Sequence, residues 1–224
     1  TFEVLEVIEK QLDNVTHATY EFSKSLQAPV LDMRLRGVLV DQQWRDRVIA
    51  DYEKDLAFIE YNLNRILIEG IGQAINWNSP AQLKNLLYQK LKLPIQKKRN
   101  TKGEYHETVD RDALEKLENY FLAQPIISHI LALRDTGKKI AVLKTSIDSD
   151  GRMRTSYNIA GTATGRFSSN LSDLGTGGNL QNVEERLRRP FIADPGMKFA
   201  YLDLEQAERR LVGAIEWNLF SDGR

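Results

Sequence analysis

The chain has 224 residues, of which 42% are hydrophobic and 28% charged, and Lys plus Arg balance Asp plus Glu at 31 each. This length can bury a core without metal or disulfide support, and the composition excludes a disordered tail. No apolar run approaches the roughly 20 residues that span a bilayer, and no signal-peptide pattern opens the chain, so we expect a soluble protein with no membrane attachment.

Side chains that often carry chemistry are missing or scattered. Cysteine is absent, which excludes disulfide frameworks, thiolate zinc sites and cysteine nucleophiles. The three histidines, His17, His106 and His129, stand far apart and lack the spacing of metal ligands. We expect them to be ordinary surface or core residues.

The neutral total charge hides a basic segment. No acidic residue occurs between Glu69 and Glu104. Such a local basic surface indicates a contact with an anionic partner, although a charge run can also be only a solvated face. The basic residues of this segment are Lys84, Lys90, Lys92, Lys97, Lys98, Arg99 and Lys102.

The first part of the chain is helical in pattern. We expect one helix up to about Leu26, ended by Pro29, and then a short helical turn closed by Gly37. From Trp44 to Ile66 apolar residues recur about every 3.7 residues, which predicts a long amphipathic helix on the order of 40 Å. The residues with this spacing are Trp44, Val48, Tyr52, Leu56, Ile59, Leu63 and Ile66.

Shorter helices should follow. Ser79 and Pro80 have the pattern of a helix cap and a first helical residue, so they predict a helix that includes Leu83, Leu86, Leu87 and Leu91. Residues 97–103 have turn composition and no apolar anchor, which indicates an exposed tip. We expect two more helices at residues 111–121 and 126–133.

The composition changes near residues 146–150, where we place a domain boundary. Residues 148–178 are rich in Gly, Ser and Thr, and residues 153–157 and 198–202 have strand-like patterns. Residues 199–203 indicate a buried strand with Asp203 at its end, before a helix over residues 205–217. A carboxylate mounted on a strand end can hold Mg²⁺, but Asp203 can equally cap the following helix.

Seven blocks of this sequence together carry a specific signal. They are residues 31–41, 78–83, 97–117, 162–169 (Thr-Ala-Thr-Gly-Arg-Phe-Ser-Ser), 179–182 (Asn-Leu-Gln-Asn), 188–193 (Arg-Arg-Pro-Phe-Ile-Ala) and 203–210 (Asp-Leu-Glu-Gln-Ala-Glu-Arg-Arg). In composition and order these blocks resemble the family A DNA polymerases, the bacterial polymerase I class and its phage relatives. The resemblance extends over nearly the whole chain.

The resemblance implies an α+β fold, namely part of the right-hand polymerase fold. Residues 1–40 would be helices that enter the polymerase region at the palm edge. Residues 41–147 would form a thumb built on long helices, and residues 148–224 a partial β-sheet palm with the first catalytic block.

The resemblance also assigns roles to individual residues. Asp203 matches the first metal-binding aspartate, and the backbone carbonyl of Leu204 would reach the same ion. Glu208 matches the glutamate that excludes ribonucleotides. Arg166 matches the arginine that reaches the minor groove at the primer end, and the block beside it and the basic tip would also contact DNA: Asn179, Gln181, Asn182, Lys97, Lys98, Arg99 and Lys102.

The sequence departs from the family pattern near these residues. Leu204-Glu205 replaces the common Tyr-Ser, so Glu205 adds a negative charge beside the site. The link from Ser169 to Asn179 is longer than usual and the segment 182–188 is shorter, which leaves the path of residues 175–178 open. We interpret those glycines as a tight turn and not as a phosphate cradle, because no Gly-Lys-Ser/Thr follows.

Family members continue beyond this region to a fingers helix and a second palm carboxylate. We therefore expect a piece or split subunit of a cytoplasmic DNA polymerase that acts on primer-template DNA and dNTPs with two Mg²⁺ ions. It would be inactive until a second polypeptide or a C-terminal portion completes the site. The alternatives are a non-catalytic DNA-binding module and a helical scaffold for a protein partner, whereas Glu208 disfavours an RNA polymerase.

Overall fold

The computed structural model describes residues 2–162 and 164–220. Ala163, which belongs to one of the recognised blocks, lies outside the described residues. The chain forms two compact units, Thr1–Phe191 and Ile192–Arg224. No helix in the described ranges is both long enough and apolar enough to cross a bilayer.

The first unit begins with three helices: α1 (Phe2–Glu9), α2 (Asn14–Ser25) and α3 (Gln27–Arg36). The expected single helix up to Leu26 is wrong, because Asp13 interrupts it and caps α2 by accepting from the backbone N–H groups of Val15 and Thr16. Pro29 does not end a helix either. It lies in the first turn of α3, where a missing N–H costs no helical hydrogen bond.

The predicted long helix is confirmed and is longer than its apolar pattern. After β1 (Val38–Val40), α4 (Gln42–Ile71) runs for 30 residues, or roughly 45 Å. Asp41 caps its start by accepting from Trp44 N at 2.9 Å, and Gly72 ends it in the left-handed conformation.

A second group of elements follows α4. Ser79 caps α5 (Pro80–Lys84), as expected, and the chain continues as a π-helical turn, η1 (Asn85–Lys90). The expected basic tip is exposed, but it is part of a hairpin in which β2 (Lys97–Arg99) pairs antiparallel with β3 (Tyr105–Glu107).

The next two helices differ in length from the expectation. α6 (Arg111–Leu117) ends four residues before Phe121, whereas α7 (Gln124–Leu143) extends ten residues beyond Leu133. The polar run from Asp135 to Lys139 hides this extension in the sequence. Ile140 and Leu143 nevertheless lie on the buried face.

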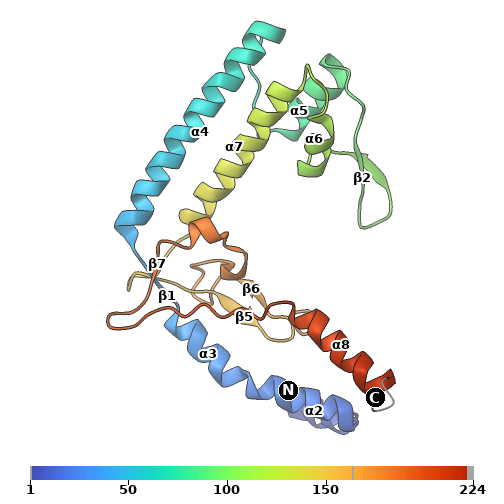
Figure 1. Ribbon diagram of the computed structural model, residues 1–224, viewed down its shortest axis with the longest axis vertical. Helices are drawn as coiled ribbons and strands as arrows, with labels where there is room; N and C mark the ends of the chain where they lie inside the picture. Colours follow the sequence, from blue (N-terminus) through green and yellow to red (C-terminus); the bar gives the residue numbers. More distant parts are fainter. Residues whose placement is uncertain (1, 163, 221–224) are drawn as a thin grey trace. The chain divides into compact units, whose positions relative to one another are not determined.

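The main core lies between α4 and α7, which run side by side (Figure 1). Leu63 and Leu67 of α4 are fully buried against the apolar faces of the other helices. A smaller core of Leu143, Val183 and Leu187 packs near the C-terminal end of α7. The other fully buried leucine and isoleucine side chains of the main core are Leu83, Leu86, Leu87, Leu114, Leu117, Ile127, Ile130 and Leu133.

Short strands follow α7. A three-stranded sheet has the order β4-β1-β7, with β4 (Arg152–Met153), and β7 (Phe191–Ile192), at whose first residue the first unit ends. A separate antiparallel pair joins β5 (Ser156–Asn158) to β6 (Ser168–Asn170). The expected strand over residues 153–157 is thus two strands. Two 3₁₀ turns, η2 (Leu180–Asn182) and η3 (Glu185–Leu187), complete the unit.

The second unit contains α8 (Ala207–Phe220), which starts two residues later than expected. The expected buried strand over residues 199–203 is wrong, because these residues have no regular structure and their side chains are exposed. Leu202, for example, is 91% exposed. A strand needs a hydrogen-bonded neighbour and a covered face, and the described ranges provide this segment with no paired strand.

Candidate functional site

Arg166 and the block 179–182 lie on neighbouring turns of the first unit. The Arg166 turn closes through Thr162 Oγ1, which donates to the Arg166 carbonyl at 2.7 Å, and through Gly165 at φ +74°. Asn179 caps η2, because its side-chain oxygen accepts from the N–H groups of Gln181 and Asn182.

Two hydrogen bonds join these turns. Gln181 Nε2 donates to the Phe167 carbonyl at 3.2 Å, and Ser169 Oγ donates to Asn179 Oδ1 at 2.7 Å. The structure therefore brings the turn of Arg166, which precedes β6, next to η2 and its cap Asn179, so that Arg166, Asn179, Gln181 and Asn182 belong to one exposed polar cluster. The side chains of Gln181 and Asn179 are exposed, and these hydrogen bonds hold their orientation without burial in a core.

The loop before Asn179 follows a defined path onto the strands. Thr176 Oγ1 donates to the Asp148 carboxylate, which also binds Arg154 at 2.5 Å. Gly177 N donates to the Ser146 carbonyl at 2.8 Å. The Thr176 hydroxyl and the Arg154 guanidinium hold the pKa of Asp148 below its usual value.

Gly175 and Gly177 both have positive φ, +74° and +70°. This agrees with the interpretation as a tight turn. A Cβ on Gly177 would collide with the Arg154 carbonyl oxygen, whereas a Cβ on Gly175 would meet open space. Of these two glycines, Gly177 is therefore the one that the close approach of two backbones requires.

We expect Gly177→Ala to lower the free energy of unfolding by about 3 kcal/mol, since it combines left-handed strain with a backbone collision. Gly175→Ala is the matched control. It has the same strain without the collision, so it should cost about 1 kcal/mol. Urea denaturation of both variants measures the difference, and equal losses would show that the Gly177 contact is not tight.

The basic hairpin places its cations on exposed strands and on the turn between them. Lys98 Nζ forms an ion pair with Asp110 at 2.6 Å, and Arg99 Nε donates to the Gly103 carbonyl at 3.1 Å. The Lys98 ammonium holds the pKa of Asp110 below its usual value, and the carboxylate raises the pKa of Lys98. Lys97, Lys98, Arg99 and Lys102 are all exposed.

Asp203, Leu204 and Glu208 belong to the second unit and are exposed. Asp203 and Leu204 precede α8 in an irregular segment, and Glu208 lies in its first turn. Gln206, between them, has φ +53°. Glu205 precedes the helix and is exposed as well.

The donors at Asp203 fit part of a magnesium site. A carboxylate and a backbone carbonyl are oxygen ligands, and Mg²⁺ takes one or two protein carboxylates beside water and phosphate oxygens. In residues 2–162 and 164–220, however, no three His, Cys, Asp or Glu side chains gather closely enough to hold a metal. These donors could contribute to a two-ion site without completing it.

Sequence reasoning missed two features of the first unit. One is the network of Asp148, Arg154 and Thr176, for which a long-range contact leaves no local signal. The other is a groove between the start of α4 and the segment after η3, which includes Arg188 and Arg189. The adjacent arginines are the available signal in the sequence, although they also belong to the family block 188–193.

Comparisons with known proteins show the family of this chain. The model of DNA polymerase family A matches residues 46–216. DNA polymerase I of Geobacillus stearothermophilus is 33% identical over 87% of this chain and 22% of its own length. The thermostable DNA polymerase I of Thermus aquaticus is 30% identical over 91% of this chain and 25% of its own. The chain thus spans about a fifth to a quarter of these relatives.

A solved structure of a polymerase domain has a similar fold. The polymerase domain of Pol1 from M. smegmatis, in complex with a DNA primer-template and dNTP, superposes with a TM-score of 0.65 and 29% sequence identity. The match covers 82% of this chain and 32% of that one. The α+β class and the partial polymerase fold are confirmed.

Proposed function

Because this chain belongs to DNA polymerase family A, we propose that it forms the thumb and the first part of the palm of a template-directed DNA polymerase. Residues 1–40 would lead into the polymerase region, residues 41–147 would be the thumb, and residues 148–224 the partial palm. The observation that carries this proposal is the superposition on a polymerase domain that holds primer-template and dNTP.

DNA would contact the polar cluster of the first unit. Arg166 would donate to purine N3 and pyrimidine O2 in the minor groove, acceptors that every correct base pair presents, so the contact would test pair geometry without reading sequence. Asn179, Gln181 and Asn182 would line the duplex beside it. The hydrogen bonds between the two turns support this role, because they hold the turns together and fix the side chains of Asn179 and Gln181 before DNA binds.

The catalytic contribution of the chain would come from Asp203. Its carboxylate and the Leu204 carbonyl would hold Mg²⁺, the ion that family A polymerases use, and the ion would stabilise charge as the primer 3′-hydroxyl attacks the α-phosphate and pyrophosphate leaves. Glu208 would occupy the space of a ribose 2′-hydroxyl and so select deoxyribonucleotides. The remaining ligands would come from a second polypeptide or a C-terminal portion with the fingers and another carboxylate.

Primer extension tests the proposal. The chain mixed with a family A fragment that carries the fingers and the second palm carboxylate should extend a labelled primer on a template when Mg²⁺ and dNTPs are added, and neither part should do so alone. Formation of the complex is verified by size-exclusion chromatography. A stable complex that binds primer-template and does not extend it would favour the non-catalytic DNA-binding module.

A further inference from the structure

A groove of about 880 Å³ lies on the first unit, beside the small core near the C-terminal end of α7. One wall comes from the first part of α4 and presents Trp44, Val48 and Tyr52. The other wall is the segment around η3 and contributes Glu185, Arg186, Arg188 and Arg189. None of these residues belongs to the polar cluster or to the basic hairpin.

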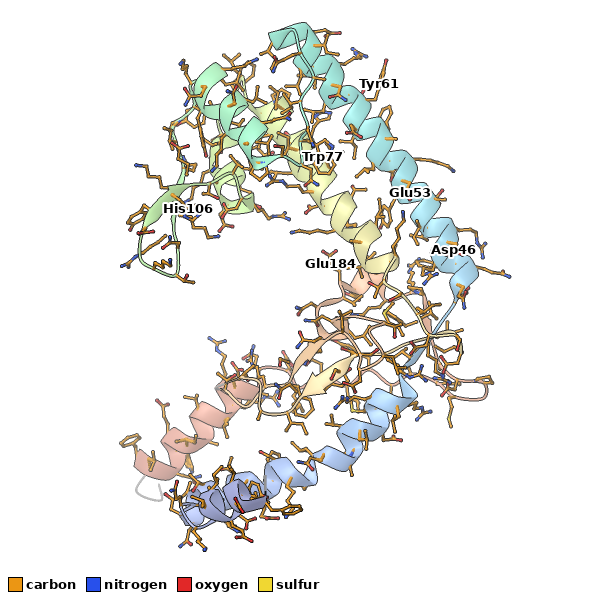
Figure 2. All side chains as sticks on the ribbon, turned by 180° about the vertical axis from the view of Figure 1, so that it is seen from behind. Asp46, Glu53, Tyr61, Trp77, His106 and Glu184 are labelled. Atoms are coloured by element: carbon orange, nitrogen blue, oxygen red, sulfur yellow. The ribbon has the colours of Figure 1, made fainter. Side chains whose placement is uncertain are left out.

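The walls are held in place by contacts outside the groove. Val183 and Leu187 pack in the small core with Leu143, and Lys144 of the α7 end forms an ion pair with Glu53 of α4 at 2.6 Å. Figure 2 labels Glu53 on α4 and Glu184 at the segment that leads into η3. Both walls are therefore anchored to the same end of α7, and the groove is a preformed feature of the fold.

The lining of the groove carries a net positive charge, with three arginines against one glutamate. In the described part of the chain, no carboxylate forms an ion pair with Arg186, Arg188 or Arg189, and Arg188 uses its Nε only to donate to the Val183 carbonyl at 3.0 Å. The three guanidiniums face one acid of the lining, Glu185. Exposed arginines without a carboxylate partner suit an anion that can accept from two guanidinium N–H groups, such as phosphate or carboxylate.

The apolar wall adds a second requirement on the ligand. Trp44 and Tyr52 are half-buried, and Lys139 Nζ lies 5.7 Å from the centre of the Tyr52 ring. Aromatic side chains beside a line of cations are the arrangement that binds single-stranded nucleic acid, in which phosphates meet the cations and bases stack on the rings. An acidic peptide would also satisfy the arginines.

The aromatic wall distinguishes these two ligands. Trp44 and Tyr52 offer ring faces on which nucleobases can stack, whereas the carboxylates of an acidic peptide satisfy only the arginines. Glu185 repels phosphates and peptide carboxylates alike, but its carboxylate can accept from the amino and imino N–H groups of a base. A strand of nucleic acid therefore offers partners to the arginines, the aromatic rings and Glu185.

From this geometry we propose that the groove binds single-stranded nucleic acid, as a site additional to the primer-template contacts. Arg186, Arg188 and Arg189 bind backbone phosphates, and a base packs against Trp44. The site is not sequence-specific, because stacking and phosphate contacts are available to every base.

Fluorescence titration of the whole chain with a single-stranded dT12 oligonucleotide tests the site. A base that packs against Trp44, one of three tryptophans, should quench its emission, so dT12 should quench the emission of the wild type. Trp44→Phe should remove most of this quenching while labelled dT12 still binds. The double variant Arg186→Ala/Arg189→Ala should weaken binding about tenfold or more. It should also reduce the salt slope by about 1.4, or about 0.7 for each lost charge.

Two matched variants control for charge and for the other DNA contacts. Arg47→Ala/Arg65→Ala removes the same charge from α4 outside the groove and should leave quenching unchanged. The hairpin variant Lys97→Ala/Lys98→Ala/Arg99→Ala/Lys102→Ala should also leave it unchanged, even if it loses duplex binding. Circular dichroism verifies the fold of each variant.

Several outcomes would overturn the proposal. They are an unaltered affinity in Arg186→Ala/Arg189→Ala, an equal loss in Arg47→Ala/Arg65→Ala, and loss of quenching in the hairpin variant. Stronger quenching by a twelve-residue poly-glutamate would identify a peptide site, and competition by dTMP as effective as that by dT12 would identify a nucleotide pocket. None of these results bears on whether the completed enzyme extends a primer.

Discussion

In the completed polymerase, replacing Asp203 with Asn should lower the rate of primer extension by about a thousandfold, which corresponds to roughly 4 kcal/mol of lost transition-state stabilisation. The amide keeps the size of the side chain and removes the charge that would hold the ion. Because Asp203 is exposed, the substitution should leave the stability of the chain within about 0.5 kcal/mol. Single-turnover extension at saturating primer-template and dNTP measures the effect.

The matched control is Glu205→Gln. It removes one exposed carboxylate two residues from Asp203, so it changes the local charge equally without changing the proposed ligand. We expect this variant to retain extension within a few-fold. A similar loss in both variants would show that only the charge of the segment matters, and full activity of Asp203→Asn would remove the ligand assignment.

Long helices were predictable because their signal is local. The spacing from Trp44 to Ile66 and the cap residues Ser79 and Gly37 are present in short stretches of sequence, and the structure confirms them. The break at Asp13 could also have been read locally, since Asp is a favoured cap. The apolar residues on both sides of Asp13 continue the helical period, and this spacing favours a single helix.

Strands were less predictable because their stability depends on a partner. The hydrophobic run at Phe199–Leu202 has the composition of a buried strand, yet it is exposed and irregular in the second unit. The hairpin of β2 and β3 shows the opposite error. Its strands are short and charged, and their pairing depends on the turn from Asn100 to Glu104 rather than on an apolar face.

Only the residues of the candidate site that belong to sequence motifs were predictable. The motifs indicated Arg166 and the block 179–182, and the structure places them together through Gln181 and Ser169. The contact of Gly177 with the Arg154 carbonyl joins residues that no local pattern connects. Their roles in DNA and metal binding remain predictions.

Removing the four cations of the basic hairpin, Lys97, Lys98, Arg99 and Lys102, should weaken duplex binding about a hundredfold and flatten its salt dependence. Each phosphate contact contributes about 0.9 to the slope of log affinity against log salt for duplex DNA, so four contacts would give about 3.6. Lys98 must leave Asp110, which lies 2.6 Å away, to bind a phosphate. We therefore expect the slope of log affinity against log salt to fall by about 3 in this variant. Fluorescence anisotropy of a labelled primer-template from low to moderate salt measures both quantities.

A variant that loses four cations elsewhere separates local contact from net charge. Lys24, Arg47, Lys54 and Arg65 are exposed cations of α2 and α4, and their replacement by Ala should change the slope by less than about 1. Asp110→Asn gives the converse result, because it frees Lys98 and should raise duplex affinity slightly. If the hairpin variant keeps the wild-type slope, or if both four-cation variants flatten it equally, the hairpin makes no specific contact with the phosphates.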